Sequence, residues 1–345
     1  MPVGDPRRHA VGRAAFGTLL TAAVFFVLAV PTKQLKPLYD HAPWENDPFD
    51  TVYSFVMFFV PLIAAGLLVQ VSLCRKTEPL PVSRVQSILR ACRVVIATVL
   101  ITVSSCWISV ITGANRSQWT GDQTAPLIAG LAVLTALTAK AILDLHRAPK
   151  RIEPSEDAPS TDWLGDAVAV AERESRWLGP LRPPTLSAVS WTSRSVISWL
   201  RRHPVLGAAA AALVFGLLVG ANQGIREQYT LSVALLTIGL LIGGMFAFLV
   251  AAGSYLGIVR SSTPLHGLPR RTLDAAVAAC AAAVVALAFR DSLWWIVGSN
   301  QPAAGAAQYA ALLGIAILAT FLVVLGAESV LRSHSQTTAC SNATE

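Results

Sequence analysis

The sequence predicts an all-α integral membrane protein, a polytopic bundle of about eight transmembrane helices. Composition gives the first indication: 54% of the 345 residues are hydrophobic and 14% are charged, whereas soluble proteins carry about a quarter charged residues. The second is that apolar residues gather into runs of about 20, long enough to cross a bilayer core as helices. Such continuous runs exclude a membrane β-barrel, whose strands are short and alternate in polarity.

The eight predicted spans cover residues 14–31, 48–73, 93–113, 125–145, 204–222, 229–258, 272–297 and 304–327. The first follows a basic stretch, as a signal peptide does, but no small-residue cleavage site follows it, so a retained helix is predicted. Residues 1–145 and 204–330 then form two four-helix halves, which suggests a 4+4 pseudo-repeat. Residues 146–203 form a cytoplasmic connector with amphipathic helices, and residues 331–345 a disordered cytoplasmic tail.

The second predicted span begins in an acidic segment, "PLYDHAPWENDPFDTVYSF", residues 37–55. Asp47 has the side chain of an N-cap, Pro48 suits the first helical position, and Asp50 favours the positive end of the helix dipole. Most of this segment is therefore interpreted as the outer rim of the span. Three polar residues have no role in that interpretation: Asp40, His41 and Glu45.

The distribution of basic residues predicts the orientation. With the N-terminus in the cytoplasm, 21 Lys and Arg residues lie in or beside the inner segments, and the outer loops hold five: Lys33, Lys36, Arg116, Arg226 and Arg290. Because cytoplasmic loops carry the excess of Lys and Arg, both termini are predicted to be cytoplasmic. The preference for arginine and alanine indicates a bacterial source, and hence the bacterial plasma membrane.

Small residues indicate how the helices pack. Gly216 and Gly220, and further along Gly239 and Gly243, have the GxxxG spacing that lets helix backbones approach closely in lipid. Packing within the chain is the first interpretation. A homodimer through the Gly239/Gly243 face is the alternative.

Charged residues are scarce inside the predicted spans. Lys140 and Asp144 are four residues apart near the cytoplasmic end of the fourth span, where they can pair with each other. No span has a carboxylate near its centre. Ion-coupled antiport is therefore disfavoured, because proton and ion pathways in membranes use such groups.

The connector is the only sizeable segment outside the membrane. Trp191 and Trp199 alternate with Arg194, Arg201 and Arg202, a pattern that suits a helix lying on an anionic inner leaflet. Membrane lipids are thus the expected partners, and a protein partner docking at residues 146–203 is the alternative. No nucleic-acid partner is expected.

No nucleotide-binding, nucleophile or zinc-protease motif is present, so no metal or cofactor is expected. The first functional expectation is a permease or flippase-like protein that is not ion-coupled. The second is a non-enzymatic subunit or regulator of a membrane complex. The third is an outer-face enzyme acting on lipid or envelope precursors, with these candidate binding residues: Asp40, His41, Glu45, Arg290 and Asp291.

Overall fold

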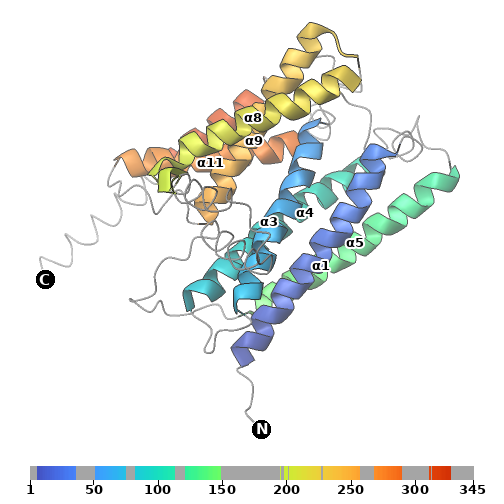
Figure 1. Cartoon of the computed structure of the whole chain (residues 1–345), viewed down its shortest axis with the longest axis vertical. Coiled ribbons are helices and arrows are strands. Elements are labelled where there is room, and N and C mark those ends of the chain that lie inside the picture. The colour runs from blue at the N-terminus through green and yellow to red at the C-terminus, as the bar shows by residue number, and fades with distance from the viewer. Residues whose placement is uncertain are drawn as a thin grey trace, which may run out of the picture. The chain divides into compact units, whose positions relative to one another are not determined.

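The computed structural model describes residues 6–35, 51–74, 82–112, 121–148, 195, 198–200, 202–226, 228–256, 268–289, 311 and 313–327. Every regular element in these residues is an α-helix, as the sequence predicted (Figure 1). The chain divides into two compact units, Met1–Gly207 and Ala208–Glu345.

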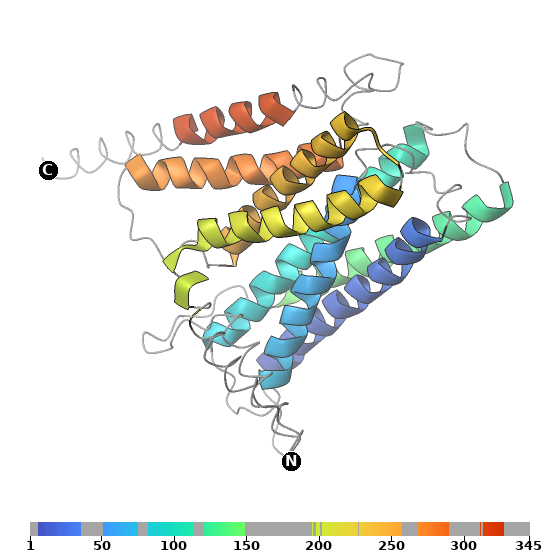
Figure 2. The same ribbon diagram turned by 45° about the horizontal axis from the view of Figure 1, so that its top comes forward.

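The first unit contains four long helices, α1 (Pro6–Gln34), α3 (Thr51–Cys74), α4 (Val82–Thr112) and α5 (Gly121–Arg147). They lie side by side, with α1 packed against each of the other three (Figures 1 and 2). All four have the continuous apolar sequences that were predicted to form spans.

Cross-helix contacts fix the directions of these helices. Gly17 and Leu28 of α1 lie against Ala141 and Gly130 of α5, so the two helices are antiparallel. Near the opposite termini of α3 and α4, the Gln70 side-chain amide donates to the Ser87 hydroxyl over 2.9 Å. The unit is therefore an up-and-down bundle, in which the start of α1 and the end of α5 lie at the same end.

The middle of this bundle is filled with apolar side chains from all four helices. Val60, Val95 and Val99 have no exposed surface, and one continuous cluster joins them. The cluster consists of Ala22, Phe25, Val60, Ala64, Val95, Val99, Val103, Cys106, Leu131 and Leu134. Small residues on α1 and valines on α4 bring the helix axes close together, which makes the interior dense.

Helix α4 begins earlier than the sequence predicted. The segment before residue 93 was expected to be a cytoplasmic loop, yet α4 is helical from Val82. Val85, Ile88 and Cys92 are buried there at helical spacing, whereas Arg90 and Arg93 are exposed. About three amphipathic turns precede the predicted span, because one face of this segment packs on the bundle and the other can meet water.

The second unit begins within α8 (Pro204–Arg226) and contains α9 (Leu231–Tyr255), α11 (Leu268–Ala288) and a shorter helix, Leu313–Ala327, drawn in red in Figure 2. α9 packs against α11. One row of large apolar side chains on α8 is exposed: Val205, Leu206, Leu213, Val214, Leu217, Leu218 and Ile225. Exposed apolar surface of this extent is typical of a helix that faces lipid.

Helices α8 and α9 form an antiparallel hairpin with a glycine at each close approach. A Cβ on Gly216 would lie 2.5 Å from Cγ1 of Ile242, and one on Gly220 would lie 2.5 Å from Cγ1 of Ile238. One turn later, Gly224 faces Ala234 at an ordinary contact distance. Packing within the chain, the first interpretation of Gly216 and Gly220, is thus confirmed. Gly239 and Gly243 differ, because a Cβ at either would meet nothing within 4 Å.

The turn of this hairpin holds one strained residue. Gln228 has a φ of 52°, in the left-handed region, and the Tyr229 amide donates to the Gly224 carbonyl over 3.1 Å to close the end of α8. We expect Gln228→Gly to raise the free energy of unfolding by about 1 kcal/mol, because glycine adopts this conformation without strain. Detergent titration followed by circular dichroism measures the change. A decrease in stability would show that the Gln228 side chain contributes more than its backbone strain costs.

Five helices are long and apolar enough to cross a membrane: His9–Pro31, Arg84–Ile108, Ala125–Arg147, Pro204–Ile225 and Leu231–Tyr255. Helix also lies at the positions of the other three predicted spans. In the part of the chain that the structure describes, Phe59–Leu73 and Leu313–Ala327 are apolar but shorter. The helical membrane class is supported, and the count of eight spans stays a prediction.

Candidate functional site

The charged pair predicted between Lys140 and Asp144 is present in the structure. The Lys140 Nζ atom donates to Oδ2 of Asp144 over 2.8 Å, one helical turn further along α5. The carboxylate is buried, with 10% of its side chain exposed, whereas the lysine side chain is 65% exposed. The pair thus has one member in the bundle and one on its outer surface.

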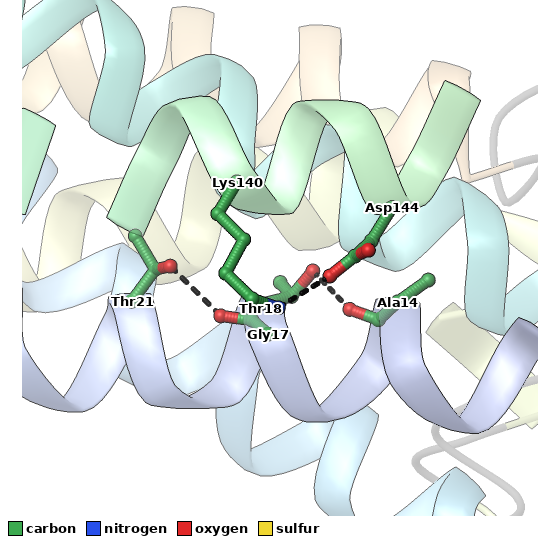
Figure 3. Close-up of polar contacts among 6 residues, drawn as sticks. All are labelled: Ala14, Gly17, Thr18, Thr21, Lys140 and Asp144. Carbon is green, nitrogen blue, oxygen red and sulfur yellow. Dashed lines mark hydrogen bonds and ion pairs between the residues drawn. The ribbon is translucent and has the colours of Figure 1, made fainter. Parts of the chain in front are cut away.

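Helix α1 provides the surface against which the carboxylate is buried (Figure 3). A Cβ on Gly17 would lie 3.5 Å from Oδ2 of Asp144 and 3.9 Å from Cα of Ala141, so the two backbones are close at this point. A larger residue than glycine or alanine would push the carboxylate outward. Gly17 and Ala141 therefore create the space in which Asp144 is buried.

The Asp144 carboxylate lies about one turn closer to the middle of α5 than the Asp144 backbone does. The Asp144 carboxylate reaches back to the level of Ala141 and Gly17, because side chains on a helix lean toward its N-terminus. Asp144 itself is three residues from the end of the candidate span Ala125–Arg147, about 5 Å at 1.5 Å per residue. The carboxylate therefore lies within about two turns of the end of that span.

Other buried polar groups near the pair bond to their own helix. Thr18 and Thr21 have no exposed surface, and their hydroxyls donate to the carbonyls of Ala14 and Gly17, each over 2.8 Å (Figure 3). Thr98, Thr102 and Thr138 make the same bond to the carbonyl four residues earlier. Threonine in apolar helices commonly satisfies its hydroxyl in this way. The hydroxyl protons are therefore used within the helices.

Polar contacts also join different helices elsewhere in the described part of the unit. The Trp107 indole N–H donates to the Thr135 hydroxyl over 2.8 Å and fastens α4 to α5. Between α3 and α4, the Gln70 amide nitrogen bonds Ser87, while its Oε1 is buried and has no partner among the described residues. Sequence reasoning missed Gln70. The feature of the sequence that could have indicated it is a single amide side chain within the otherwise apolar residues of α3.

The five candidate binding residues for an outer-face enzyme lie outside the described residues: Asp40, His41, Glu45, Arg290 and Asp291. The proposed cap at Asp47–Asp50 and most of the connector 146–203 also lie outside them. These interpretations stay predictions. Within the described residues, no group of three or more His, Cys, Asp and Glu side chains is placed to hold a metal ion.

The arrangement offers an exposed ammonium paired with a buried carboxylate at the edge of a dense bundle. Such a site can hold an ionic or polar group by charge, which is binding chemistry. Comparison of the chain with protein-family models, with curated proteins and with solved structures finds no match.

Proposed function

We propose that the chain is a multi-pass protein of the bacterial plasma membrane that acts as a non-enzymatic subunit or regulator of a membrane complex. It has eight spans, and both termini are cytoplasmic. The orientation is supported by the basic residues at one end of the first unit, where exposed Arg13, Arg90, Arg93 and Arg147 lie near the start of α1 and α4 and the end of α5. Cytoplasmic ends of spans carry such residues.

The filled interior of the first unit is the observation that supports a subunit or regulator. Ten buried side chains from four helices occupy the level at which a conducting path would cross the bundle. The threonine hydroxyls in that interior are bonded to their own backbone. A solute path needs polar groups that can exchange their partners for those of the solute. A bundle packed in this way suits a scaffold better than a channel.

Thiol labelling tests the filled interior. In a chain whose native cysteines are replaced, we expect Val99→Cys to resist a membrane-impermeant thiol reagent, because residue 99 has no exposed surface. Ser117→Cys, in the predicted outer loop, is the positive control and is expected to react from outside intact cells. Reaction at residue 99 would indicate a water-filled path and contradict the scaffold interpretation.

Partnership is tested by extracting the chain from native membranes at its natural level in copolymer nanodiscs. We expect a second protein in fixed stoichiometry with this chain. Particles that contain this chain alone would contradict the proposal. The connector 146–203 is the proposed docking segment, so its replacement by a flexible linker of equal length should release the partner while leaving the membrane unit intact.

Transport without ion coupling is the second candidate function, and the sequence alone placed it first. What favours it is the division of the chain into two compact helical units, a plan shared with transporters built from repeats. The filled core of the first unit argues against transport. Labelling of Val99→Cys would be evidence for it.

A homodimer through the Gly239/Gly243 face is also proposed. Both glycines are exposed and adjoin exposed Leu235 and Leu231 on α9, while the GxxxG pair of α8 is already used within the hairpin. Helices in lipid associate through such small-residue faces. We expect Gly239→Leu to abolish energy transfer between differently labelled chains in vesicles, and Leu213→Ala, on the exposed row of α8, to leave it unchanged. Equal transfer in both variants would contradict this dimer.

A further inference from the structure

The Lys140 ammonium has hydrogen-bonding capacity that the described residues do not use. A lysine ammonium carries three N–H donors, and among the described residues its partner is Oδ2 of Asp144. The side chain is nevertheless 65% exposed on the surface of a span. An ammonium at such a place requires acceptors, because burying it in hydrocarbon without them is costly. The Lys140 side chain extends toward Asp144, which is the direction of Arg147 and of the proposed cytoplasmic interface.

Two exposed arginines lie between Lys140 and the same end of the seam between α1 and α5. Arg147 follows Lys140 by seven residues, which is two turns and about 10 Å along the same face of α5. Arg13 lies one turn before Gly17, on the side of α1 that meets α5. Both are exposed. With Asp144 as the one carboxylate at this end of the seam within the described residues, the site carries an excess of positive charge.

Exposed apolar side chains continue the same side of the seam toward the middle of the span. At about 100° per residue in antiparallel helices, Phe16 and Leu20 of α1 fall on the same outer side as Val133 and Lys140 of α5. Phe16, Leu20 and Val133 are all exposed, by 68%, 41% and 54%. Since Gly17 faces Ala141 and Leu28 faces Gly130, Phe16 lies beside Lys140, and Leu20 and Val133 lie beyond it toward the middle of the span. Cations at one end with an apolar surface beside and beyond them match a molecule with an anionic head and hydrocarbon tails.

We propose that the outer side of the α1/α5 seam binds one anionic phospholipid. Its phosphate accepts hydrogen bonds from Lys140 and Arg147 with Arg13 nearby, and its acyl chains lie along Phe16, Leu20 and Val133. Excess positive charge favours an anionic headgroup over a zwitterionic one. The inference rests on the proposed membrane topology, since it needs this end of the seam at the cytoplasmic interface, but not on the proposed role in a complex.

The test uses the full chain, delipidated in dodecyl maltoside, with native mass spectrometry to count bound lipids. Phosphatidylglycerol is expected to bind roughly tenfold more tightly than phosphatidylcholine, and inorganic phosphate to compete weakly, because it lacks acyl chains. The double variant Arg13→Gln/Arg147→Gln should lose the preference for phosphatidylglycerol. The matched control Arg90→Gln/Arg93→Gln removes two exposed arginines of α4 and should keep it.

Each outcome supports or contradicts the binding of an anionic lipid at the α1/α5 seam. Equal binding of the two lipids by the parent chain, or equal loss in the seam and control variants, would overturn the proposal. Competition by inorganic phosphate as strong as by the lipid would assign the site to a soluble anion. Both arginines are exposed side chains, so neither variant disturbs the packed core, and the melting temperature without added lipid should stay unchanged. Failure to find a partner protein in nanodiscs would leave these results unaffected.

Discussion

Replacing Gly216 or Gly220 by alanine is expected to lower the free energy of unfolding by roughly 1–3 kcal/mol, the usual cost of forcing a methyl group into a packed interface. At Gly216 the added Cβ would lie 2.5 Å from Cγ1 of Ile242 and 3.0 Å from its backbone nitrogen. Rotation of the isoleucine side chain relieves the first contact but not the second. The two helices must therefore separate, and contacts on both sides of the glycine weaken.

Gly224→Ala is the matched control, since it lies on the same face of α8 one turn later. Its Cβ would meet Ala234 at 3.5 Å, an ordinary contact, so we expect stability to be unchanged or to rise by up to about 1 kcal/mol through helix propensity. Unfolding in mixed micelles with increasing dodecyl sulfate, followed by circular dichroism, compares the three variants. Equal losses at all three positions would mean that the hairpin is looser than its contacts indicate.

Sequence periodicity was sufficient to predict the helices but not which small residues meet. Both pairs, Gly216/Gly220 and Gly239/Gly243, have GxxxG spacing, yet one is enclosed and the other faces open space. The spacing places two glycines on one face of a helix. It carries no information on which face a neighbour covers, because that depends on turn geometry such as the left-handed Gln228 and on contacts far apart in sequence.

The candidate site was predictable only in part for a similar reason. The spacing of Lys140 and Asp144 predicts a pair within one helix, and the structure confirms it. The burial of the carboxylate depends on Gly17, more than a hundred residues earlier, and on the antiparallel register of α1 and α5. A single sequence gives no means of finding that partner. The same holds for Gln70 and Ser87, whose bond requires α3 and α4 to be neighbours.

Removing the lysine of the ion pair is the other change with a large expected effect. Lys140→Met leaves the Asp144 carboxylate buried against Gly17 without its cation, and we expect a loss on the order of 1–3 kcal/mol, the cost of an unpaired buried polar group. Nothing in the packing of α5 changes otherwise, because Lys140 is mostly exposed and methionine has similar length. The measurement is the same micellar unfolding titration.

The double variant Lys140→Met/Asp144→Leu separates the cost of an orphaned charge from the worth of the pair. Replacing both members of a buried ion pair by apolar residues is often neutral or stabilising, so we expect the double variant to recover to within about 1 kcal/mol of the parent. If that holds, the pair is not required for stability, and a role in binding accounts for its presence in an apolar span. A double variant as unstable as Lys140→Met would instead make the pair a structural element of the α1/α5 seam, because the loss would then come from the pair itself and not from an unpaired carboxylate.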